Sequence, residues 1–136
     1  MDIRIATSAD RGAVTALWEA TQLTRPWNPP DEDFERALTG ASSTILVGFD
    51  DAGELVATAM VGDDGHRGWI YYVAVPVERQ RLGLGAEIVA AAEDWLRERG
   101  CRKVELMVRD DNDDVVGFYE ALGYVPDAVR VLGRWL

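Results

Sequence analysis

One stretch, residues 69–85, constrains the fold of this chain more than any other. Its first half, Trp69 to Val75, is a run of apolar, aromatic and β-branched residues, which is typical of a strand buried on both faces. Pro76 ends the run, because proline has no N–H to donate to a sheet. A polar turn with two glycines, Gly83 and Gly85, comes next, and an alanine-rich helix begins there. The stretch predicts a strand, a glycine turn and a helix in direct succession.

Such a junction can bind an anion, because free backbone N–H groups and the positive end of the helix dipole point into the turn. Arg79 and Arg81 add positive charge there, in a chain whose net charge is −10. The segment from Gly83 lacks the third glycine of a dinucleotide-binding fingerprint, and no Gly-Lys-Ser/Thr of a Walker loop follows. From spacing alone, both a phosphate site and a plain strand–turn–helix joint stay open.

Composition narrows the class of protein. With 136 residues, 48% apolar and 28% charged, the chain has the composition of one globular domain, which we expect to span residues 1–136. No apolar run reaches the ~20 residues of a membrane span, and the N-terminus lacks the layout of a signal peptide. The negative charge argues against nucleic acid and anionic membrane as partners and favours cations such as amines. The single cysteine, Cys101, excludes an internal disulfide and fits a cytoplasmic location.

The hydrophobic pattern predicts strands and helices in one continuous α/β domain with a mixed sheet. Helices are expected after a cap at Ser8 or Asp10, and over residues 31–38, 83–99 and 112–122. Strands are expected over residues 2–6, 44–49, 55–61, 69–75 and 104–108, with one or two more within residues 124–136.

Two motifs at these positions resemble the signatures of the GNAT-type N-acetyltransferase family. The first, Gln80-Arg81-Leu82-Gly83-Leu84-Gly85, is similar to the family's Q/R-x-x-G-x-G/A acetyl-CoA motif, in the same place between a central strand and a helix. The second begins at Asn112, includes Tyr119 and ends in Gly123-Tyr124, similar to the family's asparagine, tyrosine-bearing helix and final glycine plus aromatic residue. The resemblance covers nearly the whole chain.

The resemblance implies an α/β (α+β) fold with a mixed, mostly antiparallel central sheet of six to seven strands and about four helices on its two faces. Finer details resemble the YpeA-type bacterial branch of the family: Arg25-Pro26-Trp27-Asn28, the turn at residues 64–68 and the pair Tyr71-Tyr72. The family also allows a homodimer and needs no metal, and the acidic run 110–114 carries no His or Cys that would suggest one.

The implied activity is transfer of the acetyl group of acetyl-CoA to a primary amine, by direct attack in a ternary complex. A different class stays open, a non-catalytic acyl-CoA-binding sensor or regulatory module. By resemblance, main-chain groups of the central strand bind the pantetheine arm, and the glycine turn binds the pyrophosphate. The residues implied to contact the cofactor are Val73, Ala74, Val75, Gln80, Arg81, Leu82, Gly83, Leu84, Gly85, Ala86, Asn112 and Tyr119.

Tyr119 matches the family's catalytic acid, which protonates the departing thiolate. General-acid help of this kind is typically worth ~10²–10⁴ in rate. The alternative is a structural role, since Tyr119 also belongs to an apolar stripe with Phe118 and Leu122. Asn112 matches a cofactor contact but suits an ordinary helix N-cap as well.

The base and the acceptor site are less defined. An amine of pKa ~10.4 must lose a proton before it attacks. Ordered water with Tyr71 or Glu78 is expected to take that proton, while the turn setting of His66 favours a surface residue. Trp27, Asn28 and Tyr71 are the candidate substrate contacts, although Trp27, among prolines, could equally be a hydrophobic plug.

Overall fold

The structure is a computed structural model that describes residues 1–136, and it divides into two compact units, residues 1–106 and residues 107–136. The smaller unit contains one helix, α4 (Asp113–Ala121), followed by a C-terminal segment without regular structure. The larger unit contains the sheet and the other elements. These are β1 (Asp2–Ile5), α1 (Arg11–Ala20), α2 (Pro30–Thr39), β2 (Ser43–Phe49), β3 (Leu55–Asp63), β4 (Gly68–Ala74), α3 (Leu84–Glu98) and β5 (Val104–Leu106), with short 3₁₀ turns η1 (Ser8–Asp10) and η2 (Val77–Arg79).

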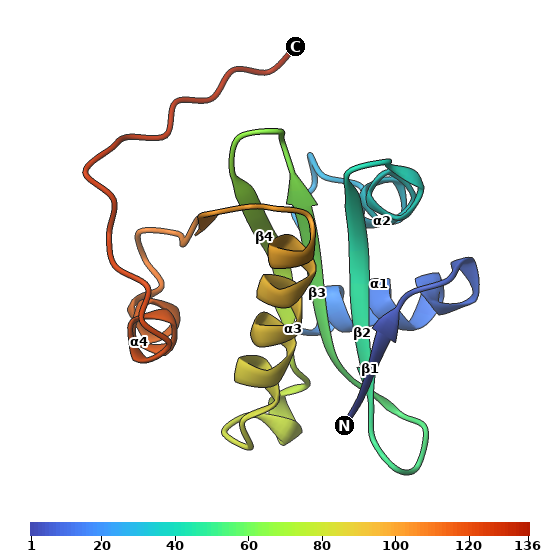
Figure 1. The fold of residues 1–136 in the computed structure, drawn as a ribbon. Coiled ribbons are helices and arrows are strands. Elements are labelled where there is room, and N and C mark those ends of the chain that lie inside the picture. The colour runs from blue at the N-terminus through green and yellow to red at the C-terminus, as the bar shows by residue number, and fades with distance from the viewer. The chain divides into compact units, whose positions relative to one another are not determined.

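The five strands form one sheet in the order β1-β2-β3-β4-β5. β1 to β4 pair antiparallel in succession, and β5 pairs parallel to β4. Within the larger unit, α3 lies on one face of the sheet and α1 and α2 lie on the other (Figure 1). The predicted mixed, mostly antiparallel sheet and the four α-helices are therefore confirmed.

Local sequence explains where the helices of this unit start and end. Pro30 occupies the first turn of α2, where its missing N–H leaves no helical bond unmade, and the acidic residues Asp31, Glu32 and Asp33 suit the positive end of the helix dipole. Gly83 takes the N-cap of α3 with φ of +83°, a conformation that glycine adopts without steric cost.

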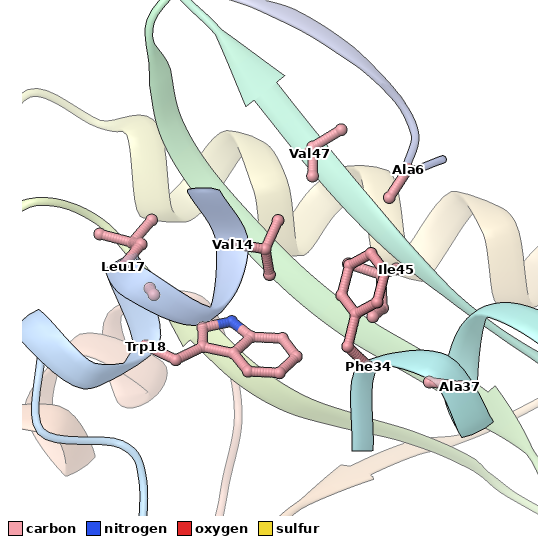
Figure 2. Packing of buried hydrophobic residues seen from close by; sticks show 9 residues of the cluster. Ala6, Val14, Leu17, Trp18, Phe34, Ala37, Ile45 and Val47 are labelled. Atoms are coloured by element: carbon pink, nitrogen blue, oxygen red, sulfur yellow. The ribbon is translucent and has the colours of Figure 1, made fainter. Parts of the chain in front are cut away.

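The core between α1, α2 and the sheet is built around two fully buried rings, Trp18 and Phe34, whose centroids lie 6.3 Å apart (Figure 2). Aliphatic side chains of α1, α2 and the strands, together with Ala6 directly after β1, surround the two rings: Ala6, Val14, Leu17, Ala37, Ile45, Val47 and Ala74. On the opposite face the helix α3 packs closely, because a Cβ at Gly68 would lie 2.6 Å from a methyl carbon of Leu96. β4 is thus fixed in the sheet from both sides.

The prediction of six to seven strands is wrong, because the sheet has five. Residues 124–136 show the alternation of a strand, but they pair with no other strand, and Val129, Val131 and Trp135 are exposed. A strand exists only where a neighbour completes its backbone hydrogen bonds, and alternation alone does not supply one. The strand predicted at 104–108 also ends earlier, at Leu106.

Candidate functional site

The edge of β4 that faces β5 is paired over only part of its length. β5 pairs with Gly68, Trp69 and Ile70 and then ends at Leu106. Beyond Ile70 no strand pairs with this edge, whereas the opposite edge stays paired with β3 as far as Ala74. Residues 71–74 therefore offer main-chain donors and acceptors that an extended ligand can pair with, as an added strand would.

A β-bulge lies in this open half of β4. Pairing moves two residues along β3, from Met60 to Thr58, while it moves three along β4, from Tyr71 to Ala74. The extra residue is accommodated at Tyr72, whose φ is +51°, an uncommon value for a bulky side chain. The bulge turns backbone groups of β4 out of the regular ladder at the point where β5 has already ended.

A buried hydrogen-bonded chain holds the bulge in place. The indole Nε1 of Trp18 donates to Thr58 Oγ1 at 3.0 Å, and Thr58 Oγ1 donates to the carbonyl oxygen of Tyr72 at 3.0 Å. Thr58 and Trp18 are fully buried. The ring of Tyr72 stacks on Trp18 with centroids 4.0 Å apart. The backbone of β4 at the bulge is consequently held by side chains of β3 and α1 rather than by regular strand pairing.

The hydroxyl of Tyr72 donates to Asp33 Oδ2 at 2.7 Å, in the first turn of α2. Burial, together with this bond to a carboxylate, raises the pKa of Tyr72 well above its usual range. Tyr72 therefore keeps its proton at neutral pH and acts as a donor to Asp33. Sequence reasoning missed Asp33 and Thr58, because their roles depend on contacts between distant segments.

The loop after β4 presents free backbone donors. In the structure, the N–H groups of residues 81–86 donate to no carbonyl. Arg81 and Gly83 both have positive φ, +64° and +83°, which turns the chain sharply before α3. A Cβ at Gly83 would meet nothing within 4 Å, so the space beside the loop is open. Gln80 Nε2 donates to the carbonyl of Val75 at 3.3 Å and closes the loop onto the end of β4.

The two arginines of the loop have different roles. Arg79 Nη2 donates to Asp50 Oδ2 at 2.9 Å and lies 3.7 Å from Glu54 Oε2, in the β2–β3 turn. Asp50 Oδ1 accepts the N–H groups of Glu54 and Ala52, which, with Arg79, lower the pKa of Asp50. Arg81 is exposed and forms no ion pair, so it is the arginine available to an anion. The sequence does not indicate this role of Asp50, because the pair with Arg79 joins distant segments.

The candidate acceptor contacts lie at the surface of the larger unit. Trp27, in the α1–α2 connection, is 55% exposed, which argues against a hydrophobic plug. The N–H of Asn28 donates to the carbonyl of Arg25 at 3.0 Å, in a tight turn. Tyr71 is 40% exposed, and burial of the remainder, with the nearby charge of Asp64, raises its pKa. Tyr71 is therefore a poor direct base at neutral pH.

The other two groups considered for proton removal are also exposed. Glu78 lies in η2 and forms no ion pair, and His66 lies in the β3–β4 turn, as its sequence setting favoured. No group of three or more His, Cys, Asp or Glu side chains is arranged to hold a metal ion. None of the helices has the length and apolar character that crossing a membrane requires.

The smaller unit carries the two remaining candidates, Asn112 and Tyr119. Asn112 occupies the N-cap of α4, but its side chain makes no capping bond, so ordinary capping does not explain an asparagine there. Tyr119 is half-buried and lies edge-on to Phe118 and Tyr124, with centroids 4.9 Å and 5.5 Å apart. Burial raises the pKa of Tyr119 to about 12. The hydroxyl thus keeps a proton that it could donate.

Comparison with known proteins points to one family. The model of the "Acetyltransferase (GNAT) family" matches residues 13–124. A protein named acetyltransferase from Pectobacterium atrosepticum is 43% identical over 136 residues, which are 100% of this chain and 96% of the relative. The names of such relatives do not separate the YpeA-type branch from the rest of the family, so that narrower resemblance stays a prediction.

Solved structures share the fold at lower identity. A putative acetyltransferase from Agrobacterium tumefaciens superposes with a TM-score of 0.82 at 23% identity, covering 99% of this chain and 100% of that one. The aminoglycoside N-acetyltransferase AAC(6')-Iy in complex with CoA superposes with a TM-score of 0.81 at 18% identity, covering 99% of each chain.

Proposed function

The chain belongs to the GNAT acetyltransferase family, and from that premise we propose that it transfers the acetyl group of acetyl-CoA to a primary amine by direct attack in a ternary complex. The observation that carries the proposal is the opening beside β4, where unpaired main-chain groups lead directly into a loop of unpaired N–H groups. An extended, negatively charged cofactor needs both features, and they lie next to each other in the chain.

The residues of the larger unit fit such a cofactor. Val73, Ala74 and Val75 would bind its extended arm through main-chain groups only, which leaves the buried side chain of Ala74 free to pack in the core. Residues 81–86 would bind its phosphates through N–H groups at the start of α3, where the helix dipole favours negative charge, and Gln80 would hold the loop beside them. Arg81 would add a formal positive charge there.

Acetyl-CoA supplies an acetyl thioester: the acceptor nitrogen bonds to the acetyl carbon, the carbon–sulfur bond breaks, and CoA leaves with a proton on its sulfur. We assign delivery of that proton to Tyr119, on two grounds. Its helix resembles the family's second signature, and its raised pKa keeps the hydroxyl protonated. Asn112 is proposed as a further cofactor contact on the same resemblance.

The acceptor must lose its ammonium proton before the attack. The raised pKa of Tyr71 makes it a hydrogen-bond donor, so Glu78 acting through ordered water is the better candidate of the two. Trp27, Asn28 and Tyr71 are proposed to contact the acceptor. Residues 1–136 are proposed to act as one acetyltransferase domain in the cytoplasm, and a homodimer follows from the family resemblance alone.

Binding and transfer can be tested separately. Acetyl-CoA should raise the melting temperature of the wild type, because a ligand that prefers the native state stabilises it. Arg81→Gln should weaken this shift, and Arg36→Gln, on the exposed face of α2, should not. A panel of primary amines is then assayed by mass spectrometry for the acetylated amine. Binding without any acetylated product would indicate the acyl-CoA sensor instead, and absence of binding would overturn both functions.

A further inference from the structure

The face of β4 next to the opening carries an aromatic pair. Trp69 and Tyr71 alternate along the strand, and their rings lie 6.4 Å apart with 18° between the planes. Ile70 between them is buried, and Gly68 meets α3, so the two rings lie on the opposite face of the sheet, the face of α1 and α2. Tyr71 is 40% exposed and Trp69 is half-buried, so the helices do not cover the pair.

A carboxylate completes this cluster. Trp69 Nε1 donates to Asp64 Oδ2 at 3.2 Å, and the other oxygen, Oδ1, accepts the N–H groups of Arg67 and His66. These backbone bonds lower the pKa of Asp64, so the group is a fixed negative charge at neutral pH. The aromatic pair therefore has a permanent anion at its edge.

No arginine of the chain lies over the rings of this cluster. Arginine lies over an aromatic ring in two places, Arg4 over Phe49 and Arg99 over Trp95, and neither involves the pair on β4. Of the basic side chains nearest in sequence, Arg67 is directed to Glu105 at 3.6 Å, and His66 lies close enough to Asp64 to contribute to the lowering of its pKa. The faces of aromatic rings attract cations, and a carboxylate beside them strengthens that attraction. The cluster has the chemistry of a cation site that no arginine of the chain occupies.

We propose that Asp64, Trp69 and Tyr71 form a subsite for a second, non-reacting ammonium group of the acceptor, which makes diamines and polyamines its substrate class. The assignment rests on the proposed acetyltransferase function. Tyr71 is the first residue of the open half of β4, so an acceptor held on the pair reaches the opening with its other end. The net charge of −10 favours the same class of ligand.

The subsite can be tested without relying on catalysis. The chain has five tryptophans, and their indole N–H signals can be followed by NMR in nitrogen-15-labelled protein, with the signal of Trp69 assigned from Trp69→Phe. Diaminopentane should shift the Trp69 signal saturably, and the neutral pentanediol should not. The signal of Trp95, whose ring on α3 is already covered by the guanidinium of Arg99, should not shift with either compound. A saturable shift at Trp27 instead of Trp69, equal shifts with both compounds, or no saturable shift would overturn the subsite.

Steady-state kinetics with a matched pair of variants provide a second test of the subsite. Diaminopentane and aminopentanol each carry a reacting amine, but only the diamine carries a second ammonium. We expect a lower KM for the diamine, and Tyr71→Leu should raise that KM about threefold to tenfold and remove the difference, whereas Tyr71→Phe, which keeps the ring, should preserve it. An unchanged preference in Tyr71→Leu contradicts the subsite. If no amine is acetylated at all, the proposed function fails, and the NMR result alone decides the cation site.

Discussion

Thr58 joins the core of the larger unit to the backbone of the candidate site. Its hydroxyl accepts a bond from Trp18 and donates one to the carbonyl of Tyr72. Thr58→Val keeps the shape of the side chain but leaves a buried indole N–H and a carbonyl at the bulge without partners. We expect a loss of about 1–3 kcal/mol in the free energy of unfolding, measured by urea denaturation. Thr44→Val is the matched control, because Thr44 is a buried residue whose hydroxyl bonds no other group of the protein, and a similar loss there would contradict the explanation.

Tyr119→Phe separates the catalytic and structural interpretations of this residue. The variant keeps the ring and its edge contacts with Phe118 and Tyr124 but has no proton to give. If Tyr119 is the acid, kcat should fall about 10²-fold or more, with the KM for acetyl-CoA unchanged. Unchanged kcat would make Tyr119 a core residue only.

The pH dependence provides an independent check of Tyr119. An acid loses activity as pH rises through its pKa, and burial places the pKa of Tyr119 at about 12. The kcat of the wild type should therefore not fall through the ordinary tyrosine range near pH 10. A fall in kcat centred near pH 10 would indicate that the acid is a group with an ordinary tyrosine pKa, and it would contradict the assignment of the acid to Tyr119.

At the scale of elements, the ion pair between Asp50 and Arg79 joins the β2–β3 turn to the loop that we propose binds the phosphates of the cofactor. Asp50 is itself fixed by two backbone N–H groups, so the ion pair holds η2, and with it the start of the loop, to the hairpin. Asp50→Asn should raise the KM for acetyl-CoA severalfold with little change in kcat, because it loosens the loop without touching the reacting atoms. Measurement of both constants over a range of acetyl-CoA concentrations tests this split.

Two further sets of substitutions show whether the ion pair between Asp50 and Arg79 itself causes the effect on KM. Glu54→Gln removes the weaker, mostly exposed partner of Arg79 and should have little effect, because exposed ion pairs contribute ~0–1 kcal/mol. The exchanged pair, Asp50→Arg with Arg79→Asp, should recover part of the affinity that either single change removes. No recovery in the exchanged pair would assign the loss to the turn itself rather than to the ion pair.

Local sequence predicted most of the elements and their order, because alternation, capping residues and glycines act over short distances. Gly83 and the strand before it were located from sequence for this reason. The bulge at Tyr72 was not, since a positive φ at an aromatic residue is stabilised by stacking on Trp18, which lies far away in the chain. The prediction of C-terminal strands was wrong because residues 124–136 have the local alternation of a strand but no distant strand to pair with.

The features of the candidate site also fall into two groups, those that local sequence predicts and those that depend on contacts between distant segments. The glycine loop at residues 80–85 was predicted from its motif, which is a local property. The main-chain role of β4 was implied by the family resemblance and stays a prediction. Which arginine is free for an anion was not predictable, since the pairing of Arg79 with Asp50 depends on how the hairpin meets η2. The role of Asp64 likewise depends on its bond with the indole of Trp69, which the sequence does not show.

At the scale of the whole molecule, net charge should distinguish the two substrates. The chain carries 24 acidic and 14 basic side chains, so its field attracts a cationic acceptor and repels the negatively charged cofactor. Salt screens such fields, with a Debye length of ~10 Å at 0.1 M and ~3 Å at 1 M. Added salt should therefore weaken the approach of the acceptor and ease that of the cofactor, except where the loop donors bind it directly.

We accordingly expect kcat/KM for diaminopentane to fall on the order of threefold to tenfold as sodium chloride rises from ~0.05 M to ~0.5 M. The fall for aminopentanol should be smaller, because it carries one charge instead of two. Steady-state rates at saturating acetyl-CoA isolate this effect from cofactor binding. Equal salt dependence for the two acceptors would mean that only the reacting amine senses the field, and the second ammonium would then have no place on the aromatic pair of β4.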